Sequence, residues 1–172
     1  MSWKFAGIII KGVEEEKIFS SFSNLNKTNE SISLSEALKT KFKDYAVGNV
    51  DGSVFMINHI LPYDSTYGKK NLSQLDQKLA ALSKNTMILC FILDGVTATY
   101  GWSFFMNGQK ARSKKNISGS QPVTFGNKLP EETKTANDDE EALIFELMAI
   151  FLEQPFEQLI FDDTSSLTIY KG

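Results

Sequence analysis

The sequence has 172 residues, of which 42% are apolar, and its formal net charge is −3. A chain of this length and composition suits one folded domain with a continuous core, which excludes an intrinsically disordered protein. A single cysteine excludes a disulfide framework, and no apolar run reaches the roughly 18 residues of a membrane span, so we expect a cytoplasmic protein without membrane contact.

The first quarter of the chain contains one apolar segment and two amphipathic segments. Residues 3–11 form a short apolar run followed by a glycine, which predicts a strand. Residues 14–25 and 33–43 carry apolar side chains at helical spacing, and the second segment begins with a Ser-x-x-Glu capping box. We therefore expect two helices, and the polar segment 24–31 predicts a loop between them.

A hairpin and a third helix are expected next. Residues 45–50 and 53–60 are strand-like and flank Asp51-Gly52, a dipeptide typical of two-residue hairpin turns. Residues 62–70 interrupt the pattern. Leucines then recur at helical spacing over 72–82, which predicts an amphipathic helix.

The segment 86–115 gives the clearest indication of the fold. It contains Asp94-Gly95 and Asn107-Gly108, both typical hairpin turns, between strand-like segments. We therefore predict a three-stranded antiparallel meander. Its middle strand, 96–106, alternates in polarity, and Tyr100 and Trp102 share the apolar face, so we interpret these aromatic residues as core.

The third strand of the meander, 109–115, is polar and rich in lysine. Such strands are typical of sheet edges, where charge prevents unwanted pairing. A period of two would put three of its cations on one face of the strand, where they could bind an anion. The candidate anion-binding residues are Lys110, Arg112, Lys114 and Lys115.

The last third of the chain begins with the irregular segment 117–137, which is long for a connection and therefore functional or mobile. Residues 138–153 predict a deeply packed helix that Pro155 ends. Residues 159–161 and 167–170 predict short strands. The whole order of elements predicts a single-domain α+β fold (1–172), with a largely antiparallel sheet and about four helices over one face.

Acidic residues are concentrated near the C-terminus. Residues 131–172 carry 11 acidic and 2 basic side chains, whereas residues 1–130 carry 10 acidic and 16 basic ones. The two parts could face each other within the fold, or the acidic part could attract a basic partner. The candidate partner-binding residues are Glu131, Glu132, Asp138, Asp139 and Glu140. Their spacing matches no calcium loop, and helix capping explains the run of acids, so we assign no metal site.

Few residues indicate catalysis. The one histidine, His59, could be a general base oriented by Asp64, but no motif surrounds it, and a structural role at a strand end is the better interpretation. Cys90 lies in an apolar run and is interpreted as a core residue. The chain has no phosphate-binding glycine motif and no nucleophile elbow, so we predict no catalytic residue and no cofactor.

Three functional hypotheses follow. The first is a non-enzymatic, protein-binding domain of a bacterial cytoplasmic protein, which neutralises a basic partner as immunity proteins do. The second is a small-ligand-binding or hydrolytic domain with a pocket between the sheet and the 117–137 segment, using His59, Tyr100, Arg112 or the carboxylates. The third is weak nucleic-acid binding by the basic strand, which the acidic pI near 5.3 disfavours.

Overall fold

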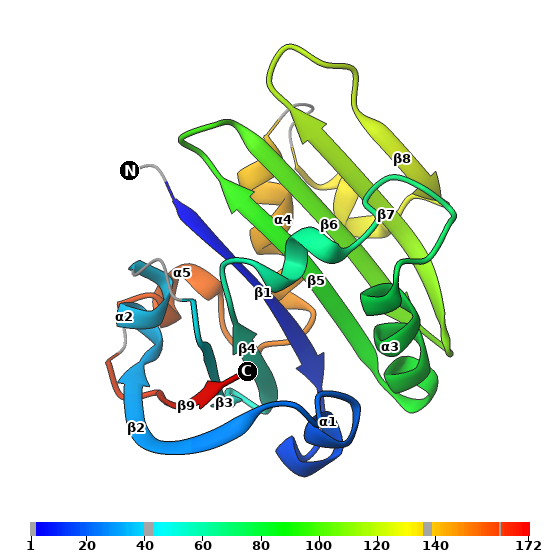
Figure 1. Cartoon of the computed structure of the whole chain (residues 1–172). Coiled ribbons are helices and arrows are strands. Elements are labelled where there is room, and N and C mark those ends of the chain that lie inside the picture. The colour runs from blue at the N-terminus through cyan, green and yellow to red at the C-terminus, as the bar shows by residue number, and fades with distance from the viewer. Residues whose placement is uncertain (1–2, 40–42, 136–138, 162) are drawn as a thin grey trace.

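Within the described residues, the centre of the molecule is one antiparallel sheet of nine strands, in the order β2-β9-β3-β4-β1-β5-β6-β7-β8 (Figure 1). The computed structural model describes residues 3–39, 43–135, 139–161 and 163–172. The strands are β1 (Lys4–Lys11), β2 (Asn26–Ser33), β3 (Tyr45–Val50), β4 (Ser53–Ile57), β5 (Met87–Asp94), β6 (Thr99–Met106), β7 (Gln109–Ile117), β8 (Val123–Gly126) and β9 (Ser166–Lys171). This architecture confirms the α+β fold and the antiparallel sheet.

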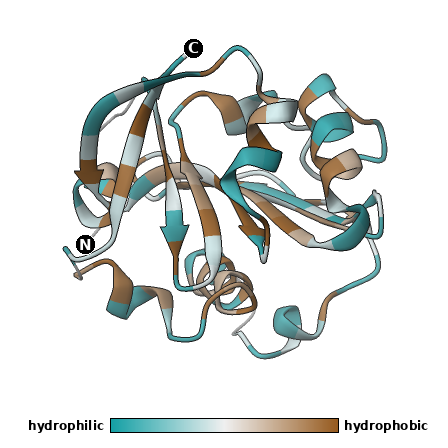
Figure 2. Cartoon of the chain, turned by 90° about the horizontal axis from the view of Figure 1, so that it is seen from below, coloured by the Kyte–Doolittle hydropathy of each residue, from teal (hydrophilic) through white to brown (hydrophobic). Residues whose placement is uncertain are grey.

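Helices pack against both faces of the sheet (Figure 2). The α-helices within the described residues are α1 (Glu15–Ser21), α2 (Leu34–Lys39), α3 (Gln74–Leu82), α4 (Glu140–Ala149) and α5 (Phe156–Leu159). Short 3₁₀ turns occur at Leu61–Asp64, Ser83–Asn85 and Pro130–Thr133. Helices α2, α4 and α5 contribute to one hydrophobic cluster, and α1 and α3 contribute to the other.

The expectation of helices over one face only is therefore wrong. The reason lies in the central strands, which are apolar on both sides. In β1, Ile9 belongs to the cluster under α4 and α5, whereas Ile8 and Ile10 belong to the cluster under α1 and α3. A strand buried on both faces reads as a continuous apolar run and requires a layer on each side.

Two of the three predicted hairpin turns are confirmed. Asp51-Gly52 and Asn107-Gly108 each adopt positive φ at both residues, as a two-residue turn of this type requires. The prediction for Asp94-Gly95 is wrong, because β6 begins only at Thr99. The Asp94 carboxylate instead accepts hydrogen bonds from the amides of Val96 and Thr97, which stabilises a longer loop.

The two ends of the sheet contain the other departures from the prediction. The polar segment expected as a loop at 24–31 is the edge strand β2, which pairs with β9 and carries a register shift between Lys27 and Ser31. Polar composition is compatible with a strand at an edge. At the other end, the 117–137 segment contributes β8 and the turn Pro130–Thr133. The strand expected at 159–161 is absent from the described residues, since Leu159 ends α5, whereas β9 confirms the strand at 167–170.

The aromatic centre of the core gives a test of the packing. Phe156 is 0% exposed and packs against Phe5, Phe55 and Phe145. We expect Phe156→Ala to lower the free energy of unfolding by about 3–5 kcal/mol, because it leaves a cavity among these rings. Urea denaturation measures the change.

Phe161→Ala is the matched control for this experiment. Phe161 lies five residues further along the chain and is 70% exposed. Its removal should change the free energy of unfolding by no more than about 0.5 kcal/mol. Equal effects of the two substitutions would contradict the described core.

Candidate functional site

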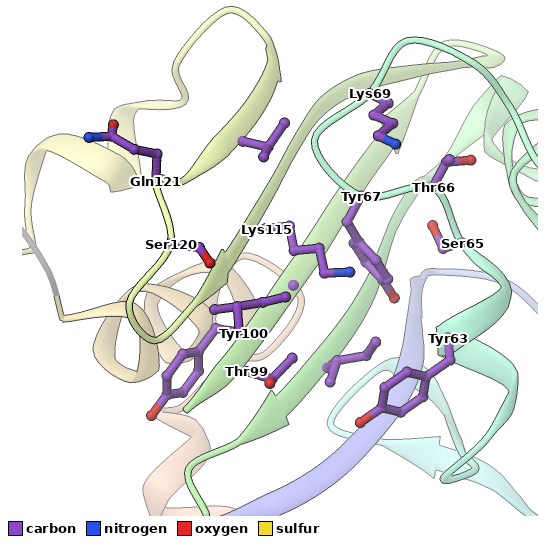
Figure 3. A pocket seen from close by; sticks show the side chains of 14 residues that line it. Tyr63, Ser65, Thr66, Tyr67, Lys69, Thr99, Tyr100, Lys115, Ser120 and Gln121 are labelled. Atoms are coloured by element: carbon purple, nitrogen blue, oxygen red, sulfur yellow. The ribbon is translucent and has the colours of Figure 1, made fainter. Parts of the chain in front are cut away.

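The structure contains a cavity of about 430 Å³ between the sheet and two loops (Figure 3). Its floor comes from β5, β6 and β7, and its walls come from residues 63–69 and 117–123. The cavity therefore lies where a pocket was predicted, beside the first part of the 117–137 segment. Its volume falls within the range of roughly 300–1,000 Å³ that is typical of small-ligand sites.

A glycine on β6 makes room for the aromatic wall of the cavity. A Cβ atom at Gly101 would lie 3.2 Å from Cγ of Tyr67, so the ring rests directly on the strand. The Tyr67 hydroxyl donates a hydrogen bond of 2.6 Å to the carbonyl of Pro62 and lies 3.3 Å from Sγ of Cys90. Burial raises the pKa of Cys90 to about 12, so this thiol is a core group and not a nucleophile.

A buried ion pair between Asp76 of α3 and Lys110 of β7 holds the wall in place. Both side chains are almost fully buried, and their charged atoms are 2.8 Å apart. The Asp76 carboxylate also accepts hydrogen bonds from the hydroxyls of Ser65 (2.5 Å) and Thr66 (2.6 Å). Lys110 in turn donates to the carbonyl of Thr66 at 2.6 Å. The loop that carries Tyr67 is therefore tied to both a helix and a strand.

A second set of contacts fixes the next residue of the same loop. The amide of Gly68 donates a hydrogen bond of 2.7 Å to Oγ of Ser113, which lies 2.9 Å from Oγ of Ser103. Gly68 has φ of +70°, and a Cβ atom there would lie 2.5 Å from the carbonyl oxygen of Val123. Only glycine satisfies both conditions, so the two walls of the cavity meet at this point.

The basic strand β7 differs from its prediction in two ways. It pairs with β8 as well as β6, so it is not an edge strand. A register shift after Phe104 pairs Phe105 with Lys110 and Phe104 with Arg112. Because this bulge adds a residue, Lys110 and Arg112 lie on opposite faces of the sheet instead of sharing one.

Three of the four candidate anion-binding residues form ion pairs within the chain. Lys110 pairs with Asp76, as described above, and the other two cations pair with acids near the C-terminus. Arg112 donates hydrogen bonds of 3.0 and 2.7 Å to both carboxylate oxygens of Glu132, and Lys114 pairs with Glu140. The expectation that the basic and acidic parts of the chain face each other is confirmed for these two pairs.

The candidate partner-binding residues occupy several environments. Glu132 and Glu140 have buried side chains within the pairs just described, whereas Glu131 is partly exposed and lies 4.0 Å from Lys134. Asp139 caps α4 by accepting a hydrogen bond from the amide of Ala142, and Asp138 lies outside the described residues. Partner binding by these residues stays a prediction.

Lys115 is the fourth candidate, and its position differs from that of its neighbours. It lines the cavity together with Lys69 from the facing loop. Neither lysine forms an ion pair with any residue in the described part of the chain. The described lining residues include no carboxylate, so these two ammonium groups give the cavity a positive charge.

The catalytic groups proposed for the pocket do not gather in it. Tyr100 contributes to the lining, but its ring packs against the core cluster on the opposite face and points away from Lys115 in Figure 3. His59 and Arg112 lie outside the described lining, and Asp64 is exposed in the turn Leu61–Asp64. The cavity has polar and apolar walls but no acid–base pair among the residues that the structure describes.

Sequence reasoning missed the wall formed by residues 65–69. The break in periodicity over 62–70 indicated a loop, but only tertiary structure shows which strands that loop crosses. Gly68, directly before Lys69, was the one sequence feature that could have indicated this wall. A glycine in a loop often marks a close approach of two backbones.

Comparisons with known proteins give no match: no protein-family model, no curated protein and no solved structure corresponds to this chain. Within the described residues, no group of three or more His, Cys, Asp or Glu is placed to hold a metal ion. None of the helices described combines the length and apolar character needed to cross a membrane. The functional argument therefore depends on the cavity and its side chains.

Removing one partner of the buried ion pair tests its structural role. In Asp76→Ala, the Lys110 ammonium group loses its carboxylate while it stays almost fully buried, which should lower the free energy of unfolding by about 3–5 kcal/mol. The double variant Asp76→Asn with Lys110→Met removes both charges, so its free energy of unfolding should fall much less. Urea denaturation compares the two, and a loss below about 1 kcal/mol in Asp76→Ala would match an exposed pair instead.

The same double variant tests how the stability of the fold depends on pH. Burial alone raises the pKa of Asp76, but hydrogen bonds from Lys110, Ser65 and Thr66 outweigh it and hold the pKa below its usual value. A carboxylate of this kind stabilises the fold above its unfolded pKa of about 3.9, and the contribution is lost as the pH falls through the lower folded pKa. Unfolding free energies measured across this acidic range should therefore fall more steeply for wild type than for the double variant. Parallel curves would contradict the assignment.

Proposed function

We propose that this protein binds a small anion in the cavity that Lys69 and Lys115 line. The observation that carries the proposal is the contrast within β7. Lys110, Arg112 and Lys114 are neutralised by acids of the chain, whereas Lys115 points into a cavity whose described lining contains no acid. A cation in a concave site that has no ion-pair partner among the described residues favours a negatively charged ligand.

The cavity supports binding more than catalysis. The hydroxyl groups of Ser65, Thr66 and Tyr67 have structural tasks: the first two donate to Asp76, and the third donates to a backbone carbonyl. General acid–base chemistry commonly uses a carboxylate or a histidine to activate a nucleophile, and the described lining contains neither, only lysine and tyrosine as titratable groups. A hydrolytic reaction has correspondingly less support.

The other two hypotheses from the sequence have less support from the geometry. Glu132 and Glu140 are buried in internal pairs, so a basic protein partner could not reach these carboxylates without breaking them. Nucleic-acid binding through β7 has the same difficulty, because phosphate contacts need accessible cations. Binding to a basic partner and a cytoplasmic location remain predictions.

Neutralising the two lysines tests the proposal. We expect the wild-type protein to bind at least one of four anions, which are acetate, inorganic phosphate, octanoate and octyl phosphate, in isothermal titration calorimetry at low salt. The double variant Lys69→Gln with Lys115→Gln should weaken that binding about tenfold or more, because each substitution replaces a charged hydrogen-bond donor with a neutral one. Backbone NMR shifts should map the bound anion to residues 63–69 and 115–123.

The charge-matched control is Lys27→Gln with Lys171→Gln. These exposed lysines lie on β2 and β9, at the far end of the sheet from the cavity (Figure 1). The control variant should keep wild-type affinity. If both double variants lost the same amount of anion affinity, the net charge of the protein would explain the binding, and the cavity would not be the binding site.

A further inference from the structure

We infer that the ligand is an amphipathic anion, with one acidic head group between Lys69 and Lys115 and a hydrocarbon or aromatic body against Ile117 and Val123. This inference rests on the proposed function and adds the chemical class of the ligand. It predicts discrimination between anions of the same charge, which the two lysines alone would not produce.

Exposed apolar side chains are concentrated at this cavity. Tyr63 is 52% exposed, Ile117 is 39% exposed and Val123 is 46% exposed, and all three line it. They account for three of the seven large apolar side chains that are exposed in the described part of the chain. Single exposed apolar residues are common on protein surfaces, but their collection around one hollow is typical of a ligand-binding groove.

Each lysine has an apolar neighbour within the cavity. Lys115 and Ile117 lie two residues apart on β7, so both point to the same face at a spacing of about 7 Å. Lys69 follows Gly68, which abuts Val123 across the two walls. In Figure 3 the Lys115 side chain extends toward the Tyr67 ring, with Lys69 above it and Tyr63 below. A ligand that reaches one ammonium group therefore also covers apolar surface.

A purely polar anion would use only part of this site. Both lysines are open to solvent to some degree, and exposed ion pairs contribute little to affinity because water and salt screen them. An apolar body removes Ile117 and Val123 from water and displaces the water that screens the head group. Most of the affinity should therefore come from the apolar body, and the lysines should select for its charge.

A carboxylate and a phosphate monoester are both compatible with the lysine pair, so the experiment includes both. Calorimetry compares octanoate with acetate, octyl phosphate with inorganic phosphate, and both octyl anions with 1-octanol. We expect at least one octyl anion to bind ten times more tightly than its short counterpart and than octanol. The head group for which the octyl chain increases affinity more identifies the ligand as a carboxylate or a phosphate monoester.

Variants of the apolar wall separate this inference from the proposed function. Ile117→Thr with Val123→Thr keeps the branched shape but adds hydroxyl groups, and it should weaken binding of the octyl anion at least fivefold while leaving the affinity for its short counterpart unchanged. Val96→Thr is the control, because Val96 is exposed in the β5–β6 loop and does not line the cavity. Thermal melting curves verify that all variants remain folded.

The possible results have distinct meanings. Equal affinity for the short and octyl anions overturns the inference, while anion binding in the cavity stands. Octanol binding as tightly as the octyl anions overturns the proposed role of the lysines. Failure of all four anions to bind overturns both.

Discussion

The buried ion pair between Asp76 and Lys110 is the interaction on which the walls of the cavity depend. It joins α3 to β7, and through Ser65 and Thr66 it fixes the loop that forms one wall of the cavity. Burying two charges is costly unless their remaining hydrogen-bonding capacity is used. The loop hydroxyls and the Thr66 carbonyl supply that capacity, so the loop and the ion pair stabilise each other.

Pairing within the chain also accounts for the uneven charge of the sequence. Acids from α4 and the turn Pro130–Thr133 neutralise cations of β7 on one face of the sheet, and Asp76 neutralises Lys110 on the other. The bulge between Phe104 and Phe105 makes this division possible, because it sends neighbouring cations to opposite faces. After this pairing, the described cavity keeps the positive charge of Lys69 and Lys115 beside apolar surface. This combination suits the charged ligand with an apolar body that we propose.

The groups that stabilise the loop are different from the two lysines that line the cavity. The polar groups that hold the loop in position are satisfied by one another, whereas Lys69 and Lys115 have no ion-pair partner in the described chain. For the ligand that we propose, walls that are fixed in this way would require little ordering on association. The close approach of Gly68 to Val123 also holds the two walls next to each other.

The sequence by itself determined the α+β class, two of the three hairpin turns and the burial of Trp102 and Cys90, because periodicity and turn chemistry act over a few residues. A pocket beside the 117–137 segment was one of several alternatives that the sequence left open. Only the tertiary structure decided that helices cover both faces, that 26–33 is a strand, and that Lys110 is buried while Lys115 lines the cavity. These outcomes depend on partners distant in the chain. A one-residue bulge reverses the direction of every later side chain in a strand. The alternation of polar and apolar residues in the sequence does not predict where such a bulge occurs.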